Sequence, residues 1–282
     1  MLRWPWAGAC GLRDVAVSIR ELAQIDDLHA LGELFAEVWG RPGEPPINSD
    51  ILKALAHSGN YVSAAYVDGR LVGGLVGWFG GRPPHELHMH SHILGVISGT
   101  DGRGLGFELK QHQRRWCLER DVKVIEWTTD PLVRRNAYFN LTKLGARARE
   151  YLVNVYGEMT DEINAGEESD RLLISWRLDS ESAIAAAAGR GHPPRIEELR
   201  RDGAAVVLAA GDSGEPVATP SSARVLLCEV PEDIVALRRS DPSAARSWRM
   251  ALRKTFTDAI AAGYEVSGAT QSGWYVLETR AN

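Results

Sequence analysis

Residues 87–106 read LHMHSHILGVISGTDGRGLG and decide the fold of this chain. The alternation of residues 87–98 predicts a histidine-bearing strand, the glycines of residues 99–106 predict a turn, and the sequence after them predicts a helix over residues 105–120. The first turn of a helix presents N–H groups without helical partners at the positive end of the helix dipole. A glycine-rich turn at this place is therefore suited to bind the phosphate of a cofactor.

Strands and helices continue on both sides of this stretch. Asp68-Gly69 lies between two apolar runs and is a strong hairpin signal, and Ser49 or Asp50 is expected to cap a helix that follows it. Apolar spacing predicts, in chain order, a strand at 15–22, helices at 25–39 and 50–57, strands at 61–67, 71–79 and 123–129, a helix at 132–144, and strands at 150–155 and 171–178.

The composition is that of a soluble globular protein. Of the 282 residues, 44% are hydrophobic and 24% are charged, which are ordinary proportions. The formal net charge of −5 argues against a nucleic acid partner, because phosphate backbones call for a basic surface. No apolar run approaches the roughly 18 residues that a membrane span needs, so no membrane partner is expected.

The cysteines and the N-terminus indicate a cytoplasmic protein. Cys10, Cys117 and Cys228 are odd in number and widely spaced, so they fit neither a disulfide framework nor a metal motif. Residues 1–13 are expected to form a flexible leader rather than a signal peptide, because a proline and a glycine interrupt any apolar segment.

The arrangement resembles the GNAT N-acetyltransferase superfamily over about residues 15–178. The residues that carry the resemblance are Leu94-Gly95-Val96-Ile97, Arg103-Gly104-Leu105-Gly106, Asn136-Ala137 and Lys143-Leu144-Gly145-Ala146. The runs at 89–92, 127–132 and 135–137 resemble, more narrowly, a subgroup of longer bacterial members with a C-terminal extension. Some members of this subgroup lie near enzymes that handle N-acylated amino acids.

The resemblance implies an α/β fold with a mixed sheet and an acyl-CoA site. Family members open a V between the fourth and fifth strands and lay the pantetheine arm along the fourth, here Leu94, Gly95, Val96 and Ile97. A backbone N–H near Gly95 or Val96 would polarise the thioester carbonyl. Asn136 would bond the amide arm or the fifth strand, or have a plain role on the helix surface. The pyrophosphate is expected on the amides of Gly102, Arg103, Gly104, Leu105 and Gly106. The acyl group implied is acetyl or a similar short one, and no metal is expected.

Two positions depart from the family pattern. The phosphate loop of the family usually opens with Gln or Arg, whereas Asp101 stands there, and a carboxylate beside a pyrophosphate is unfavourable. The family also often has a Tyr that protonates the departing thiolate, at the position of Leu141 here. Tyr138 lies one turn earlier on the same predicted helix and is the candidate general acid.

His88, His90 and His92 alternate along one predicted strand, so their side chains share one face. His90 lies thirteen residues before Arg103, about where several family members place a catalytic glutamate. Imidazole, with an ordinary pKa near ~6.5, suits proton removal at neutral pH. His90 or His92 is therefore predicted to act as base or to contact the acceptor, with a structural role as an equal alternative. A zinc site is the least favoured reading, because three alternate strand residues rarely converge on one ion.

Trp127 and Asp130 end the strand that follows the glycine-turn helix. An aromatic wall and a carboxylate at this place are predicted to receive a cationic amine substrate. The alternative is that Trp127 lies in the core and Asp130 caps the following helix, with Pro131 at its first position.

The last third of the chain predicts a smaller α+β unit. Residues 180–197, rich in Ala, Gly and Pro, predict a linker between a domain at 14–179 and an accessory domain at 198–282. This unit would cover the acceptor side, mediate dimerisation or complete the sheet. Its predicted elements are strands at 204–210, 224–230, 264–271 and 274–279, and helices that begin at Pro231 and at Asp241-Pro242.

Together these features predict an acyl-CoA-dependent N-acyltransferase that acts on a primary amine of a small molecule, such as an amino acid. The reaction would proceed by direct attack in a ternary complex, because no Cys or Ser nucleophile with a paired base is visible. One alternative is an acyl-CoA-binding protein without turnover, which Asp101 and Leu141 favour. Another is transfer to a protein lysine or N-terminus.

Overall fold

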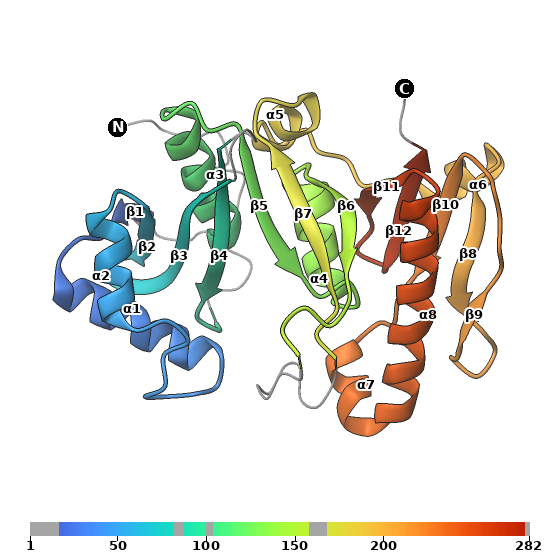
Figure 1. Ribbon diagram of the computed structural model, residues 1–282, viewed down its shortest axis with the longest axis horizontal. Helices are drawn as coiled ribbons and strands as arrows, with labels where there is room; N and C mark the ends of the chain where they lie inside the picture. Colours follow the sequence, from blue (N-terminus) through green and yellow to red (C-terminus); the bar gives the residue numbers. More distant parts are fainter. Residues whose placement is uncertain (1–16, 82–86, 100–103, 158–167, 280–282) are drawn as a thin grey trace, which may run out of the picture. The chain divides into compact units, whose positions relative to one another are not determined.

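The computed structural model describes residues 17–81, 87–99, 104–157 and 168–279 (Figure 1). The leader predicted at residues 1–13 therefore lies outside the described residues.

The chain divides into two compact units. Unit 1 comprises residues 1–76 and 94–109, and unit 2 comprises residues 77–93 and 110–282. Three elements contribute residues to both units: β3 (Arg70–Gly80), β4 (His88–Val96) and α3 (Leu105–Leu118).

Unit 1 holds a small sheet with two helices beside it (Figure 1). β1 pairs with β2 antiparallel. The buried face of α1 includes Leu31, which packs on the sheet at Gly74, where a Cβ atom would lie 2.2 Å from the Leu31 side chain. The absence of a side chain at Gly74 thus lets the helix approach. The remaining elements of unit 1 are β1 (Val17–Glu21), α1 (Ile25–Val38), α2 (Ser49–His57) and β2 (Tyr61–Val67).

The predicted hairpin between β2 and β3 is confirmed. Asp68 and Gly69 have φ angles of 49° and 77°, the left-handed backbone that a two-residue hairpin turn requires. The predicted cap of α2 is wrong by one residue. Asn48 accepts a 2.9 Å hydrogen bond from the N–H of Ile51, whereas Ser49 is already the first helical residue.

Unit 2 is built around a sheet with the strand order β3-β4-β5-β7-β6-β11-β12-β10-β8-β9. β4 and β5 run parallel, whereas β5 with β7 and β7 with β6 run antiparallel. The mixed sheet and the α/β class predicted from the sequence are therefore confirmed. The further strands are β5 (Val124–Thr129), β6 (Arg147–Leu152), β7 (Arg171–Arg177), β8 (Ala205–Ala210), β9 (Pro216–Ala218), β10 (Val225–Glu229), β11 (Tyr264–Ala269) and β12 (Trp274–Thr279).

The C-terminal strands extend this sheet. Val266 of β11 pairs with Ala148 of β6 in antiparallel fashion, and β11 pairs with β12 in the predicted hairpin, whose turn contains Gly273 at φ 95°. The last third of the chain therefore completes the sheet, one of the three roles that the sequence left open.

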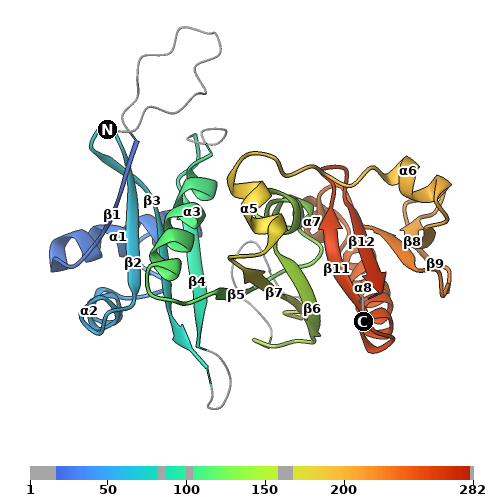
Figure 2. The same ribbon diagram turned by 90° about the horizontal axis from the view of Figure 1, so that it is seen from above.

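Helix α8 (Pro242–Ala261) covers the C-terminal strands and lies along β11 (Figures 1 and 2). Its apolar stripe is buried, with Trp248, Leu252 and Phe256 all at most 2% exposed. Asp241 caps the helix by accepting a 2.9 Å hydrogen bond from the N–H of Ala244. The predicted start of this helix is confirmed. The short helix before it, α7 (Ile234–Ser240), begins three residues after the predicted start at Pro231. The reason is that Asp233 caps the helix by accepting a 2.9 Å hydrogen bond from the N–H of Ala236.

Three elements differ from the prediction. The region expected to be a linker contains α5 (Glu181–Ala187) and the first two residues of α6 (Ile196–Arg201). Helix α5 forms because Ser180 caps a run of alanines, the best helix formers. The helix expected at 132–144 is α4 (Arg134–Ala137) followed by a π-helix, η1 (Tyr138–Lys143). β6 begins three residues earlier than expected. Among the described residues, no helix is both long and apolar enough to cross a membrane.

Candidate active site

The three histidines of β4 lie on one face of the strand, as their spacing predicts. His88 and His90 are half-buried and His92 is exposed, whereas Met89 and Ser91 on the opposite face are buried. The indole of Trp78 on β3 lies beside two of the imidazoles, with ring centroids 4.9 Å from His90 and 4.5 Å from His92. An aromatic side chain thus orders both candidate bases.

The surroundings of His90 keep its imidazole neutral. Burial, followed by the charges of His92, His88 and Lys110, lowers the pKa of His90 from 6.5 to about 4. A neutral imidazole has a free lone pair at pH 7, so His90 is able to accept a proton.

The opposite face of the sheet holds a buried ammonium group. Lys110 of α3 is 3% exposed, and its Nζ donates to Ser91 Oγ at 3.0 Å and to Gln113 Oε1 at 3.1 Å. The same nitrogen lies 3.7 Å from the ring centroid of Trp127, a cation–π contact. Burial lowers the pKa of Lys110 from 10.5 to about 7.

These contacts correct the prediction for Trp127. Its side chain is 9% exposed and packs under Lys110 and edge-on to Trp176 at 6.2 Å. Trp127 is therefore a core residue, the alternative that the sequence left open, because odd-numbered positions of β5 face α3 rather than the histidine face.

β4 and β5 pair over a short distance only. Among the described residues of unit 2, their parallel register comprises Met89 with Ile125 and His90 with Glu126. Both strands continue beyond these partners, β5 as far as Thr129. The two strands therefore part after His90 and leave backbone groups that a ligand is able to use.

The residues expected to hold the pantetheine arm, Leu94, Gly95, Val96 and Ile97, belong to unit 1. The Ile97 N–H donates to the Val72 carbonyl at 2.9 Å, which ties the end of β4 to β3. A Cβ atom on Gly95 would lie 2.9 Å from the Trp39 ring. Glycine is thus required where the strand passes the helix.

Helix α3 starts directly after a glycine with positive φ, as the glycine-rich sequence predicts. Gly104 has a φ of 71°, and its carbonyl accepts the N–H of Glu108 at 3.0 Å. Leu105 is buried and anchors the first turn, followed by the half-buried Gly106. The other members of the predicted phosphate loop, Asp101, Gly102 and Arg103, lie outside the described residues.

Asn136 and Tyr138 lie at the junction of α4 and η1, and both side chains are half-buried. Leu141, where the family often has its tyrosine, is 3% exposed and packs in the core. The π-helix ends at Lys143. Gly145, two residues later, has a φ of 71°, and its Cβ position lies 2.5 Å from the Ser182 carbonyl oxygen. Only glycine suits this position.

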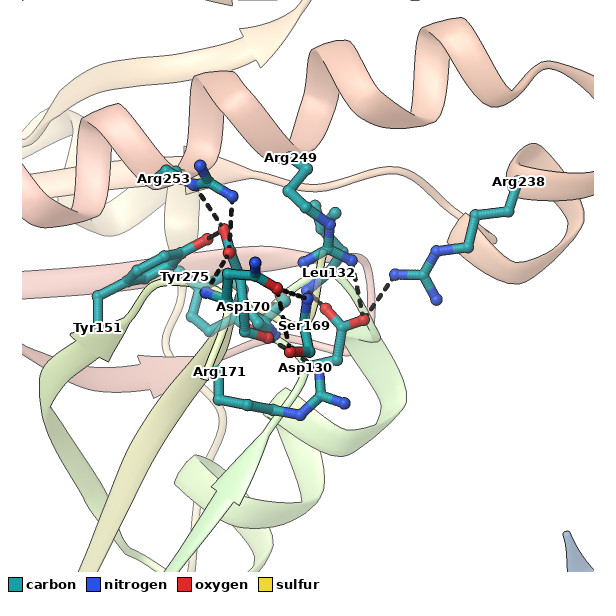
Figure 3. A network of polar contacts seen from close by, with 12 residues as sticks. Asp130, Leu132, Tyr151, Ser169, Asp170, Arg171, Arg238, Arg249, Arg253 and Tyr275 are labelled. Carbon is teal, nitrogen blue, oxygen red and sulfur yellow. Dashed lines mark hydrogen bonds and ion pairs between the residues drawn. The ribbon is translucent and has the colours of Figure 1, made fainter. Parts of the chain in front are cut away.

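Asp130 does not have the substrate role that the sequence predicts. Its Oδ2 lies 2.6 Å from Arg238 and 3.1 Å from Arg249, and its Oδ1 accepts the Leu132 N–H at 2.9 Å (Figure 3). All three charged side chains are buried. Burial raises the pKa of Asp130, but the two guanidinium groups outweigh it and hold the pKa below its usual value. The carboxylate is thus occupied by the C-terminal helices.

A second buried carboxylate completes the network. Asp170 accepts hydrogen bonds from the Tyr151 hydroxyl at 2.7 Å and from Arg253 at 2.7 and 2.9 Å, and Arg253 also pairs with Glu168 (Figure 3). The sequence analysis missed this cluster, because no local motif signals a contact between residues 83 positions apart. It links β6 and β7 to α8.

Among the described residues, no group of three or more His, Cys, Asp or Glu side chains is arranged to hold a metal ion.

Comparison with known proteins finds one family model that matches part of the chain. Residues 26–145 match the model of the acetyltransferase (GNAT) family. These residues are therefore similar to a GNAT acetyltransferase domain, and the chain continues beyond them to residue 282. The fold of this family supports transfer of an acyl group from acyl-CoA.

Solved structures have the same fold at low sequence identity. A candidate acetyltransferase from Acinetobacter baylyi ADP1 is 14% identical with a TM-score of 0.50, covering 61% of this chain and 97% of its own. An N-acetyltransferase from Staphylococcus aureus Mu50 is 15% identical with a TM-score of 0.47, covering 58% and 99%. Arabidopsis thaliana Naa50, in complex with a bisubstrate analogue, is 19% identical with a TM-score of 0.45, covering 56% and 97%. No curated protein matches the chain in sequence.

Proposed function

We propose that the protein transfers a short acyl group, acetyl or similar, from acyl-CoA to the primary amine of a small molecule such as an amino acid. The observation that carries the proposal is the separation of β4 from β5 after His90, next to a face that bears His90 and His92. Backbone groups released from a sheet are able to bind the amides of a pantetheine arm, and imidazoles beside them are able to take a proton.

The resemblance to the family supports the following roles. The strand end from Leu94 to Ile97 and the turn from Gly102 to Gly106 hold the acyl-CoA, with Asn136 as a further donor. His90 takes a proton from the acceptor ammonium, directly or through water, and the resulting amine attacks the thioester carbonyl. The C–S bond breaks, and Tyr138 supplies the proton that the thiolate needs. The second proton that the nitrogen loses when the amide forms passes through water to Tyr138 and restores its hydroxyl. His92 contacts the acceptor.

The acceptor is held near the histidine face without help from Asp130, whose charge two arginines already balance. Both described cysteines, Cys117 and Cys228, are free and buried, which supports a reducing, cytoplasmic setting.

A second candidate function is acyl-CoA binding without turnover. The buried Leu141 favours it, because this position lacks the hydroxyl that often protonates the thiolate in the family. A third candidate function is acyl transfer to a protein N-terminus or lysine, which a panel of peptide substrates would test.

The test is release of free thiol from acetyl-CoA and succinyl-CoA in the presence of amino acids, other small amines and peptides. His90→Asn and His92→Asn are compared with the parent, and His192→Asn, an exposed histidine outside the site, is the control. We expect turnover with a small amine, and a fall of about 100-fold or more in kcat for His90→Asn. Full turnover in both site variants would remove the histidines from the mechanism. Tight CoA binding without turnover for any acceptor would support the second function.

A further inference from the structure

Behind His90, the histidine face carries a second pair of ionisable groups. Nε2 of His88 lies 3.7 Å from Oε2 of Glu126. Glu126 is the register partner of His90 across the parallel strands, so its side chain and those of both histidines point to the same face. The Glu126 carboxylate thus lies beside the His88 imidazole, on the face of the sheet that also bears His90.

A glycine on β3 holds the His88 ring in this place. A Cβ atom on Gly80 would lie 2.7 Å from Nε2 of His88 and 3.1 Å from its Cε1. The ring therefore occupies the space that any other residue at position 80 would fill. This close approach aims Nε2 toward Glu126 instead of leaving the side chain free to turn away.

The pair of His88 and Glu126 has access to water. The side chains of His88 and Glu126 are 27% and 28% exposed. Side chains two residues apart on a strand are spaced by roughly 7 Å, a span that a short chain of water molecules bridges. A proton on His90 thus has a path through water to His88.

We propose that His88 and Glu126 are positioning residues that relay the acceptor's proton from His90 to solvent. The inference rests on the proposed function. The proton leaves the acceptor nitrogen for His90, passes through water to His88, whose Nε2 lies 3.7 Å from the Glu126 carboxylate, and then leaves for bulk solvent. No atom other than this proton moves, and the amine is left neutral for attack.

The surroundings of His90 explain why a relay would help. Burial and the fields of His88, His92 and Lys110 all disfavour the charged imidazole, and the pKa of His90 falls to about 4. Protonated His90 is therefore a short-lived state, and a neighbour with a carboxylate partner shortens it further. The charged and titratable groups near this path are Glu126 on β5, the other two histidines on β4, and Lys110 on α3.

The experiment compares Glu126→Gln and His88→Asn with the parent, using Glu150→Gln as a matched control, since Glu150 is an exposed strand carboxylate on β6. We expect each relay variant to lower kcat about tenfold or more without a change in the KM for acyl-CoA. Rising concentrations of imidazole buffer should restore much of the loss, because a diffusible base replaces the missing relay. Gly80→Ala, which displaces the His88 ring, should behave like His88→Asn.

Two further results decide the inference. The double variant of His88 and Glu126 should be no slower than the slower single variant, because the two residues act in one path. The relay is overturned if Glu126→Gln keeps the parent kcat, if the two losses multiply, or if buffer has no effect on the variants. Loss of turnover in His90→Asn with full turnover in Glu126→Gln would leave the proposed function standing and remove the relay alone. A parent without turnover would overturn both.

Discussion

Lys110 is a buried ammonium group whose removal should stabilise the protein at neutral and acidic pH. It is 3% exposed and contacts a hydroxyl, an amide oxygen and an indole face. Among the described residues, no carboxylate pairs with it. Burial of an uncompensated charge is unfavourable, which is why its pKa falls from 10.5 to about 7.

The magnitude follows from this pKa. A tenfold change in an equilibrium constant is worth roughly 1.4 kcal/mol, so a fall from 10.5 to about 7 sets the full penalty at about 5 kcal/mol. Below pH 7 both the folded and the unfolded state carry the charge, and the folded state bears the whole penalty. Between pH 7 and 10.5 the folded state loses the proton while the unfolded state keeps it, so stability rises with pH.

The perturbation is Lys110→Met, which keeps an unbranched side chain of similar length and removes its charge. The free energy of unfolding is measured with urea at pH 6 and pH 9 for the parent, this variant and Lys123→Met, an exposed control. We expect the free energy of unfolding of the parent to rise by about 2 to 3 kcal/mol from pH 6 to pH 9 because of Lys110. The variant should lack this gain and should be more stable than the parent at pH 6.

The reasoning would be refuted by a Lys110→Met protein that shows the same pH dependence as the parent. A loss of more than about 2 kcal/mol at pH 6 would also refute it, because the cation–π contact would then outweigh the burial of the charge.

Three further predictions concern single residues. Asp130→Asn leaves two buried arginines without their carboxylate, so the free energy of unfolding in urea should fall by about 3 to 5 kcal/mol, and a loss below about 1 kcal/mol would show the ion pairs to be dispensable. Gly145→Ala places a Cβ atom 2.5 Å from the Ser182 carbonyl oxygen at a φ of 71°; thermal unfolding should reveal a loss of about 1 to 3 kcal/mol, and an unchanged Tm would contradict the contact. Because the pKa of His90 is about 4, the acidic limb of kcat/KM that depends on it should lie below pH 5; a limb near pH 6.5 that disappears in His90→Asn would contradict this assignment.

Local signals in the sequence predicted most of the fold. Asp68-Gly69 specified its hairpin because a two-residue turn with positive φ has few alternatives. The alternation of the histidine strand placed His88, His90 and His92 on one face, as observed. Gly104 correctly indicated the start of α3, because its φ of 71° is a backbone conformation that favours glycine.

Contacts between distant residues were beyond the reach of local patterns. Asp130 seemed available to a substrate because its partners, Arg238 and Arg249, come 108 and 119 residues later. Trp127 was predicted to bind the substrate because its position at the end of a strand does not reveal that α3 covers its face of the sheet. Its packing under Lys110 depends on how the helix crosses the sheet.

The region at 180–197 shows how context decides between two local signals. Glycine and proline at its end favoured a linker, whereas Ser180 and the alanines favoured a helix. The structure has α5 there, and the hydroxyl of Ser182 donates a 2.8 Å hydrogen bond to the carbonyl of Gly145. This contact ties α5 to the end of the π-helix.

The most direct test of acyl transfer is mass spectrometry of the product formed from acetyl-CoA and an amine acceptor, with the parent and His90→Asn side by side. The account predicts an acceptor whose mass has increased by one acetyl group, formed in step with free CoA thiol by the parent and far more slowly by the variant. Thiol release without any acylated acceptor, or equal product from both proteins, would contradict it.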